Sequence, residues 1–409
     1  MVKGGCVDRL SALLGLPLGR KSELGVEHTA AEIAQQPKIW PGTLLLCRER
    51  QAELRAFLAR QAGLPVLLVG AGTSDFVGRS VERLLEQRWH APVRAVASTE
   101  LLTGMHEWLR TDSNTLCISF SRSGDSSEGV AVIEEMKRRF PRVAHLLITC
   151  NPRGAMAKLT QQHPQSYALV LDPATNDRGL AMTSSFSNMV VGGQALAYLD
   201  DLDGYGAILE QLAESAESLL PRAADEAAKL AKSGFARVCF LGSGALMVTA
   251  AESALKVQEL TAGRIFTMSQ SFLGLRHGPL SFLDAQTLVV AYLASEAGTR
   301  SYESDLLREL REKQLGVTIV ATGFALTPEI REMAQVALEL APENRSGTHT
   351  PPDALRPPLD VIFGQLLGLF CSLEVGLKPD TPSPSGAISR VVSQVKIHPP
   401  ARTSTDFSG

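Results

Sequence analysis

The sequence predicts an α/β protein built from two units in tandem, each a parallel sheet covered by helices on both faces, as in a flavodoxin-like three-layer sandwich. Short apolar runs alternate with amphipathic stretches from Leu64 onward, and continuously apolar strands of this kind belong to buried parallel sheets. The same alternation starts again after about Leu220. Each half also opens alike, because a strand-like run ends in G-x-G before a helical stretch at residues 67–74 and again at 239–245.

The expected elements follow this alternation along the chain. Residues 1–60 are expected to be helical, with a capping box at Thr29 and Glu32, a break at Pro37 and a second helix over Thr43–Arg60. In the first half we expect the strands Val66–Val69, Val93–Ala97, Leu116–Phe120, His145–Thr149 and Tyr167–Leu171, and the helices Gly78–Trp89, Glu128–Arg139 and Thr183–Asp201.

The second half is expected to begin after a linker in the polar, Ala- and Glu-rich stretch Leu202–Ser233. Its expected strands are Val238–Leu241, Thr287–Leu293, Val317–Ala321 and Val336–Leu340, and its last helix is Leu359–Gly376. The Gly- and Pro-rich stretch 343–358 is expected to be a loop. The apolar run Ile388–Ile397 in the C-terminal tail is expected to dock on the body of the protein.

Composition narrows the class of protein. A chain of 409 residues with 44% hydrophobic and 20% charged residues is typical of a globular protein with two or three domains. The net charge of -3 and the absence of a Lys/Arg cluster exclude nucleic acid as an expected partner. No apolar run reaches the length of a membrane helix, no leader cleavage site is seen, and the six cysteines form no CxxC pair. We therefore expect a cytoplasmic protein with reduced, buried cysteines and no membrane partner.

Two hydroxyl-rich turns at successive strand ends predict an anion site. The first contains Gly72, Thr73 and Ser74, and glycines with helix N-terminal N–H groups allow close approach of anionic oxygen. The second contains Ser121, Arg122, Ser123 and Ser126 at a strand end that opens a helix. Taken alone, the first stretch is equally typical of a tight strand-to-helix turn, and the second of a serine-rich turn that caps a helix, without any bound ligand. Together they favour a phosphate cradle, from which the neighbouring acids Asp125 and Glu128 must point away.

Two further motifs are candidates for the rest of the pocket. The first is a helix start that contains Thr183, Ser184 and Ser185. Taken by itself it indicates N-capping of the helix, and taken together with the two turns it indicates a further wall of the pocket. On a helix, Glu252, Lys256 and Glu259 share one face, for which a solvated ion-paired surface is the usual explanation.

His277 follows in the turn R-H-G-P, which should expose it. From chemistry alone, a functional role for His277 is about as well supported as the alternative, an exposed histidine without such a role. The eight histidines show no metal-ligand spacing, and no P-loop is present, so neither metal nor cofactor is expected.

In combination, these motifs resemble the SIS (sugar isomerase) family: G-x-G-T-S, S-x-S-G-[DE], A-L-K-x-x-E and R-H-G-P-L. The resemblance covers roughly Leu44–Pro399 of this chain. The same pattern resembles the isomerase half of glucosamine-6-phosphate synthase. Three further stretches, His28–Trp40, Leu171–Asp177 and Ile388–Pro399, are similar to the AgaS branch of galactosamine catabolism.

The resemblance implies two tandem SIS domains, expected at residues 44–205 and 206–380, with a helical extension at 1–43 and a tail at 381–409 that docks near the active site. It implies that the serines of the two turns bind the 6-phosphate of a sugar. It also implies that Glu259 moves a proton between C2 and C1, and that His277 opens the sugar ring from the neighbouring subunit of a homodimer.

The chain departs from the synthase at two points. Arg122 replaces a glutamine and could add charge to phosphate binding, and Ser393 or a neighbour stands near a synthase lysine, with Lys396 shifted. The lost lysine and the missing glutaminase domain argue against glutamine-dependent amination.

The activity implied is conversion of D-galactosamine 6-phosphate to D-tagatose 6-phosphate and ammonia. The alternatives are a tagatose-6-phosphate ketose/aldose isomerase, which needs the same proton chemistry, and a sugar-phosphate-sensing protein. The last is disfavoured because no DNA-binding segment is seen and Glu259 and His277 are both present.

Overall fold

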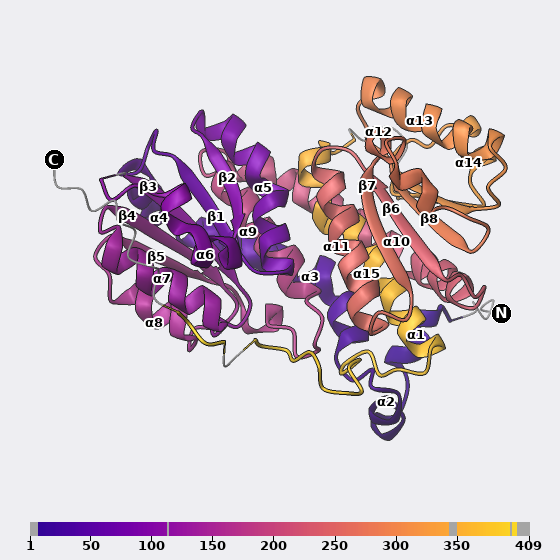
Figure 1. Ribbon diagram of the computed structural model, residues 1–409, viewed down its shortest axis with the longest axis horizontal. Coiled ribbons are helices and arrows are strands. Elements are labelled where there is room, and N and C mark those ends of the chain that lie inside the picture. Colours follow the sequence, from indigo (N-terminus) through magenta and orange to yellow (C-terminus); the bar gives the residue numbers. More distant parts are fainter. Residues whose placement is uncertain (1–6, 113, 343–349, 393–394, 399–409) are drawn as a thin grey trace.

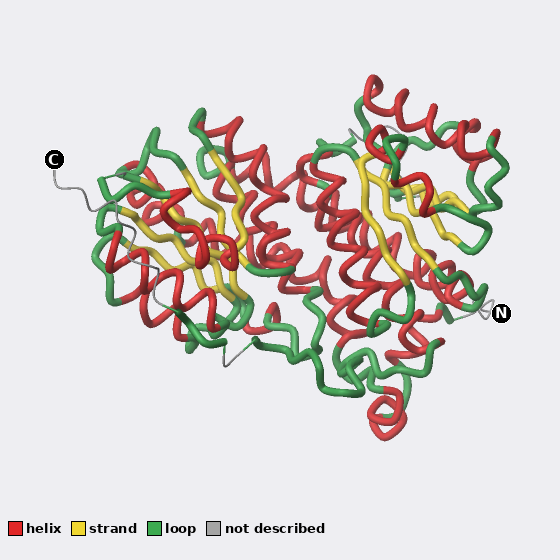
Figure 2. Tube along the Cα trace, viewed as in Figure 1, coloured by secondary structure: helices red, strands yellow, loops and turns green. Residues whose placement is uncertain are grey.

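The computed structural model describes residues 7–112, 114–342, 350–392 and 395–398 and contains two parallel five-stranded sheets (Figures 1 and 2). The first sheet has the order β2-β1-β3-β4-β5. Its strands are β1 (Val66–Gly70), β2 (Val93–Ala97), β3 (Thr115–Ser121), β4 (Val143–Thr149) and β5 (Ser166–Val170). Every residue of β1, β3 and β4 is buried, as expected for strands covered on both faces.

The second sheet repeats this order. It reads β7-β6-β8-β9-β10, with strands β6 (Arg237–Gly242), β7 (Phe266–Ser271), β8 (Thr287–Tyr292), β9 (Thr318–Gly323) and β10 (Val336–Glu339). The first and second sheets also begin alike, because Gly72 and Gly244 have nearly identical dihedral angles, φ 56°, ψ −124° and φ 56°, ψ −126°. The α/β prediction with two parallel sheets is therefore confirmed.

Helices cover both faces of the two sheets and fill the space between them (Figure 1). The N-terminal helices are α1 (Arg9–Leu14), α2 (Leu18–Leu24), α3 (Thr29–Glu49) and α4 (Gln51–Ala59). Helices α5 (Thr73–Trp89), α6 (Ser98–Trp108), α7 (Ser127–Arg139) and α8 (Ala155–Gln161) alternate along the chain with the strands of the first sheet, and α9 (Ser184–Ala197) and α10 (Leu202–Ala231) follow its last strand. The second half adds α11 (Ala245–Leu260), α12 (Phe272–Leu275), α13 (Ala297–Glu312), α14 (Pro328–Met333) and α15 (Pro357–Glu374). Among the described residues, none of these helices is both long and apolar enough to cross a membrane.

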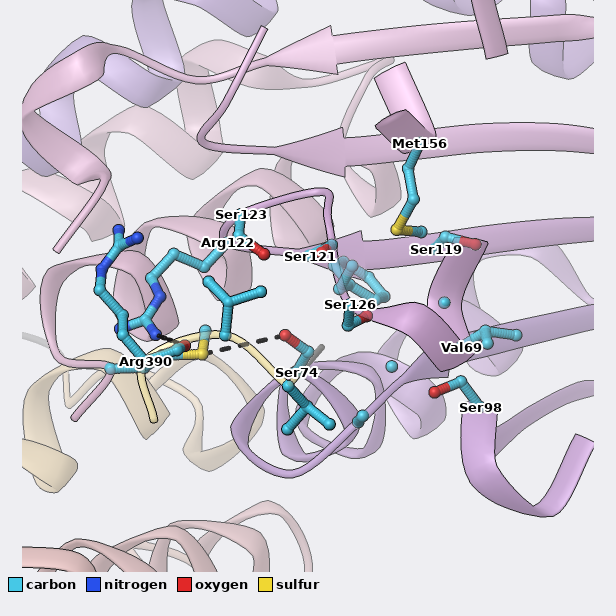
Figure 3. A pocket seen from close by; sticks show the side chains of 17 residues that line it. Val69, Ser74, Ser98, Ser119, Ser121, Arg122, Ser123, Ser126, Met156 and Arg390 are labelled. Carbon is cyan, nitrogen blue, oxygen red and sulfur yellow. Dashed lines mark hydrogen bonds between the residues drawn. The ribbon is translucent and has the colours of Figure 1, made fainter. Parts of the chain in front are cut away.

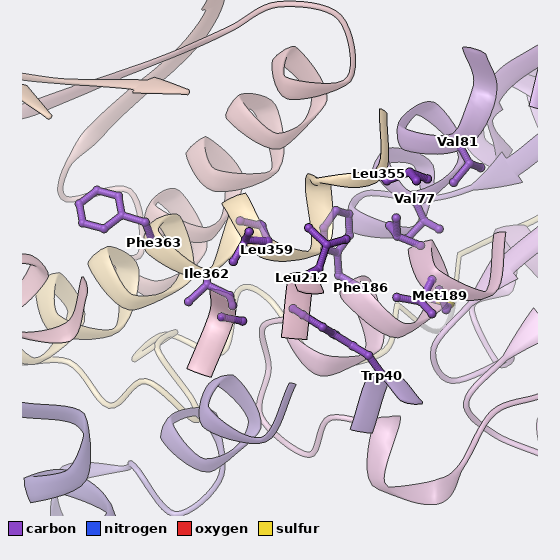
Figure 4. Close-up of a cluster of buried hydrophobic side chains, with 14 of the residues drawn as sticks. Trp40, Val77, Val81, Phe186, Met189, Leu212, Leu355, Leu359, Ile362 and Phe363 are labelled. Atoms are coloured by element: carbon purple, nitrogen blue, oxygen red, sulfur yellow. The ribbon is translucent and has the colours of Figure 1, made fainter. Parts of the chain in front are cut away.

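The largest hydrophobic core lies between the two sheets (Figure 4). Trp40 of α3, Phe186 of α9 and Leu359 of α15 meet there and are fully buried. Helix α15 also packs closely on α11, since a Cβ atom at Gly364 would lie 2.2 Å from Ser253 Oγ. One at Gly368 would lie 3.1 Å from the backbone oxygen of Lys256. The two glycines therefore let α15 lie directly against α11 at Ser253 and at the backbone of Lys256.

The expected break at Pro37 is wrong. Helix α3 continues through Pro37 and Pro41, and also through the expected domain boundary at 43/44. Proline cannot donate to the carbonyl four residues earlier, that of Ile33, but Gln36 Nε2 donates to this oxygen over 3.1 Å. The capping box is wrong as well, because Thr29 is already helical and its N–H and hydroxyl donate to Asp380 over 2.7 Å each.

Other expectations differ in detail from the structure. All expected strands are present with ends within two residues, but β7 was not expected. The stretch expected to be a linker is the 30-residue helix α10, which packs its alanines and leucines on α3 and α15 and crosses the expected boundary at 205/206. Of the expected 343–358 loop, residues 343–349 lie outside the described residues, and 353–355 form a 3-10 turn. Five cysteines are buried and free, while Cys6 lies outside the described residues.

Candidate active site

A polar cavity of about 120 Å³ opens at the carboxyl edge of the first sheet (Figure 3). Gly70 and Ser121 are the last residues of β1 and β3, so parallel pairing brings the two predicted turns to the same edge. The cavity is lined by six serines, two arginines and apolar residues from several parts of the chain: Val69–Ala71, Ser74, Ser98, Ser119–Ser123, Ser126, Gly129, Met156, Met182 and Arg390–Val392. The structure therefore gathers Ser74, Ser121, Arg122, Ser123 and Ser126 in one place.

The hydroxyl groups of this cavity are arranged to donate. Ser121 Oγ accepts from the Gly124 N–H at 3.0 Å, and Ser123 Oγ accepts from the Asp125 N–H at 3.2 Å. Their own O–H groups are thereby left for a ligand. Helices α5 and α7 also begin at the cavity, with Ser74 in the first turn of α5 and Ser126 as the N-cap of α7. Hydroxyl donors beside two helix N-termini form a site suited to a phosphate group.

The acid nearest to this cradle faces away from it. Asp125 accepts from the Ala155 N–H at the start of α8 over 2.8 Å, and from Asn151 Nδ2 over 3.4 Å. Its negative charge is used to cap a neighbouring helix, which removes the conflict between an acidic residue in the turn and an anion in the cavity.

Gly72 and Thr73 precede Ser74 but do not line the cavity. Gly72 has the positive φ that the strand-to-helix turn requires. Thr73 is buried and turns its hydroxyl toward α11, away from the serines of the cradle. It therefore connects the cradle to the second half of the chain.

Arg122 is buried at the rim of the cavity and is already bound to protein groups. Nη1 donates to the carbonyl oxygens of Gly179 and Leu180 over 3.2 and 3.0 Å, and Nη2 donates to that of Arg390 over 2.6 Å. Burial lowers the pKa of Arg122 and the nearby Arg390 lowers it further, while the charges of Asp177 and Glu259, among others, oppose this. Glu259 and Lys256, both predicted to belong to the site, do not line this cavity.

Thr183, Ser184 and Ser185 lie behind the cavity, and they do not form a wall of it. The N–H groups of all three donate to the carboxylate of Asp177 over 2.7 to 3.0 Å. The hydroxyls of Thr183 and Ser185 donate to the same carboxylate. The fourth motif residue, Met182, does line the cavity, and its sulfur lies 4.0 Å from Ser74 Oγ. The three hydroxyl residues thus hold the loop before α9 through Asp177.

The face of α11 predicted to be charged is buried in the structure. Lys256 and Glu252 are fully buried, and the Glu259 side chain is 26% exposed. Lys256 Nζ lies 2.6 Å from Glu259 Oε2 and 3.3 Å from Glu252 Oε1, and it donates to Thr73 Oγ1 over 2.9 Å. The Thr73 hydroxyl in turn donates to Glu252 Oε1 over 3.2 Å. The solvated ion-paired surface is therefore wrong, and these side chains form an interior network between the two sheets.

The protonation of this network follows from its burial. Burial raises the pKa of Glu252 to about 8. The nearby charge of Lys256 lowers this pKa, and the charge of Glu259 raises it. Burial alone lowers the pKa of Lys256, but the two glutamates outweigh this and raise it above its usual value. At neutral pH, Glu252 therefore holds a proton while Lys256 is charged and pairs with Glu259, its closer carboxylate.

His277 lies in an exposed turn and does not line the cavity of its own chain. Its N–H donates to the Gly274 carbonyl over 3.0 Å, and the next residue, Gly278, has φ 111°. The preceding Arg276 pairs with Glu309 of α13 at 2.6 Å, which fixes the turn against the second unit. His277 is therefore available to a group outside this chain.

Sequence reasoning missed the contribution of Arg390. The apolar run Ile388–Ile397 was expected to dock, but Ile388, Val392, Val395 and Ile397 are exposed, and the tail reaches the cavity through Arg390, Val391 and Val392, which line it. The sequence signal for Arg390 was the I-S-R triplet of that tail, residues 388–390. Of the residues proposed to replace the synthase lysine, Ser393 lies outside the described residues and Lys396 is exposed. In the part of the chain that the structure describes, no three His, Cys, Asp or Glu side chains are grouped to hold a metal ion.

Comparison with known proteins finds a matching family model and similar proteins over most of the chain. A family model for the SIS domain matches residues 60–199. The AgaS protein of Streptomyces coelicolor is 38% identical over 376 residues, with 91% of this chain and 95% of that protein covered. The D-galactosamine-6-phosphate deaminase AgaS of Escherichia coli is 35% identical over 390 residues, with the same coverage.

Solved structures show the same architecture. The structure of tagatose-6-phosphate ketose/aldose isomerase from Escherichia coli has a TM-score of 0.81 at 32% identity, with 91% of this chain and 96% of that chain covered. A structure from Clostridium novyi NT has a TM-score of 0.88 at 32% identity, with 93% and 96% covered. Both similarities extend over both sheets.

Proposed function

The chain belongs to the AgaS family of SIS-domain proteins, and we propose that it converts D-galactosamine 6-phosphate and water to D-tagatose 6-phosphate and ammonia. The observation that carries this proposal is the connection between two sites. A serine cradle lies between two helix N-termini, and the residue before Ser74, Thr73, is hydrogen-bonded to the Lys256–Glu259 pair. Such an arrangement would hold the phosphate at one end of a sugar and present a carboxylate to the other end.

In the proposed reaction, the serine hydroxyls and the N–H groups that begin α5 and α7 bind the 6-phosphate. The sugar ring opens to the aldehyde. Glu259 then removes the proton from C2 and returns it to C1, which converts the 2-amino aldose into a 2-imine with a C1 hydroxymethyl group. Water adds to the imine carbon, ammonia leaves, and the ketose remains. Lys256 holds Glu259 Oε2 at 2.6 Å and so fixes the orientation of the carboxylate.

His277 is proposed to move the proton that opens the ring, from a neighbouring subunit of a homodimer. Support for this role comes from its exposure in a fixed turn and from its absence from the cavity of its own chain. An imidazole can both accept and return a proton.

One assay tests the proposed function. Purified protein is incubated with galactosamine 6-phosphate, glucosamine 6-phosphate and tagatose 6-phosphate, and ammonia and ketose are measured separately. Equal amounts of ammonia and ketose from galactosamine 6-phosphate are expected. A Glu259→Gln preparation, purified in the same way, controls for contaminating activity. Ketose without ammonia, or no turnover, would show that the proposal is incorrect.

The second candidate is a tagatose-6-phosphate ketose/aldose isomerase. It is favoured by the names of solved structures with this fold, such as that from Escherichia coli, and it uses the same transfer between C1 and C2. The assay separates the two candidates, because this activity consumes tagatose 6-phosphate and releases no ammonia.

A further inference from the structure

A short segment of the C-terminal tail forms one wall of the serine cavity. After α15 ends at Glu374, beside the second sheet, the chain runs back to the first sheet (Figure 1). Arg390, Val391 and Val392 reach the cavity there. The Val392 carbonyl accepts from the Ser127 N–H over 3.2 Å, at the first residue of α7. The tail thereby contacts one of the helix N-termini that surround the cradle.

Two arginines hold this tail segment in place. Arg390 Nη2 donates to Asn176 Oδ1 over 2.6 Å, and its Nε donates to the Asp177 carbonyl over 2.8 Å. Arg122 Nη2 donates to the Arg390 carbonyl over 2.6 Å. The loop at 176–180 therefore receives hydrogen bonds from both arginines. Figure 3 shows the two side chains together at one end of the cavity, with Ser98 and Met156 at the other.

Three of the five N–H groups of the Arg122 guanidinium are directed to the protein. Both of its terminal nitrogens bind backbone carbonyls, three in all, from the loop and from the tail. A guanidinium that gave up these bonds to a phosphate would leave three backbone carbonyl oxygens without these partners, which is unfavourable inside a protein. The hydroxyls of Ser121 and Ser123 carry no such commitment, because their oxygens accept hydrogen bonds and leave the O–H groups to donate.

We propose that Arg122 is a positioning residue, which fastens residues 390–392 to the loop at 176–180 and so completes the phosphate site without touching the phosphate. This inference rests on the proposed function for the identity of the ligand. It revises the expectation that Arg122 adds its charge directly to phosphate binding. The hydroxyl and N–H donors of the cradle bind the anion, and Arg390 acts with Arg122 on the same segment.

Limited trypsin digestion tests the fastening without any substrate. Trypsin cleaves after Arg390 only when that residue is released, so Arg122→Ala is expected to speed this cleavage at least tenfold, as followed by mass spectrometry. Arg122→Lys, which keeps the charge but loses the planar fork, is expected to lie between wild type and Arg122→Ala. Arg311→Ala, on the exposed side of α13, is the matched control. Unchanged cleavage in Arg122→Ala would overturn the proposal even if the protein had another activity.

A double-mutant cycle on galactosamine 6-phosphate turnover separates positioning from direct contact. Arg122→Ala and Arg390→Ala are each expected to raise KM about tenfold and to change kcat less than threefold, because the site loses a wall but keeps its catalytic groups. The double variant should be no worse than about twice either single variant, since both act through one segment. Multiplicative effects on KM would mean that Arg122 binds the phosphate itself. Absence of turnover in wild-type protein would reject the proposed function and leave the digestion result standing.

Discussion

Lys256 Nζ lies 2.9 Å from Thr73 Oγ1, and this hydrogen bond joins the helix that begins at the serine cradle to the helix that carries the candidate base. The hydroxyl accepts from Lys256 and donates to Glu252, so one oxygen atom orders a lysine and a protonated glutamate. Since Ser74 is the next residue along the chain, movement of the cradle and of the Lys256–Glu259 pair must be coupled. The relative position of the serine cradle and of the candidate base is therefore built into the packing of α5 on α11.

Replacement of Thr73 by valine keeps the shape of this contact and removes its hydrogen bonds. Lys256 and Glu252 would each lose a partner inside the protein, and we expect the free energy of unfolding to fall by about 1–3 kcal/mol. We also expect kcat/KM for galactosamine 6-phosphate to fall about tenfold or more, because Lys256 would no longer hold Glu259 in register with the cradle. Thr73→Ser, which retains the hydroxyl, is the control for both measurements. Wild-type turnover in the valine variant would show that this contact does not position the base.

The raised pKa of Glu252 predicts how stability changes with pH. The native state holds the proton up to a pKa of about 8, whereas an ordinary glutamate loses it near 4.5. Between these two pH values the native state binds more protons than the unfolded state. The contribution of Glu252 to the free energy of unfolding is therefore full below about pH 4.5 and is lost as the pH rises to about 8. The expected slope is a loss on the order of 1 kcal/mol per pH unit.

Glu252→Gln isolates this effect, because the amide has the shape of the protonated acid and cannot ionise. Urea unfolding at pH 6, 7 and 8 should show that wild type loses stability relative to the variant as pH rises. Glu32 and Glu303, whose pKa values are also raised to about 7, are present in both proteins and cancel in the difference. Parallel pH profiles would mean that Glu252 is ionised throughout this range.

The strands were predictable because a parallel sheet buried on both faces needs continuous apolar runs. β7 was missed since it is an edge strand, whose sequence Phe266–Ser271 is mostly polar and half exposed. The course of α3 could not be read from Pro37, because its continuation depends on a side-chain bond from Gln36. The 30 residues of α10 resemble a polar linker until the helices that cover their apolar side are known.

The site was predictable where the chain itself sets the geometry. Turns at the ends of β1 and β3 had to meet, so the serine cradle followed from the order of strands. By contrast, the spacing of Glu252, Lys256 and Glu259 is the same on a solvated helix as on a buried one. Their burial comes from the packing of α5 on α11, which brings Thr73 to Lys256 and Glu252. The role of Asp177 in binding Thr183, Ser184 and Ser185 likewise depends on a loop fold that spacing does not reveal.

Glu259→Gln should separate catalysis from binding. The amide cannot take a proton from C2, so kcat is expected to fall by about 10² to 10⁴. The phosphate site is formed by other residues, and the affinity for galactosamine 6-phosphate, measured by calorimetry, should change less than threefold. Exchange of the C2 proton with deuterated water should also stop. Glu312→Gln, exposed on α13, is the matched control. Exchange at the wild-type rate would assign the base to another residue.

The proposed use of His277 across a subunit interface predicts that two inactive variants restore each other. Glu259→Gln and His277→Asn are each expected to be nearly inactive as pure proteins. In a mixture allowed to exchange subunits, half of the dimers would be mixed, and each would contain one site with both Glu259 and His277. About a quarter of wild-type activity should then return, because one site in four is complete. If His277 acts within its own chain, every site in the mixture lacks one group and no activity returns. A tagged copy of one variant, recovered with the untagged other, shows that exchange took place and makes the second result decisive.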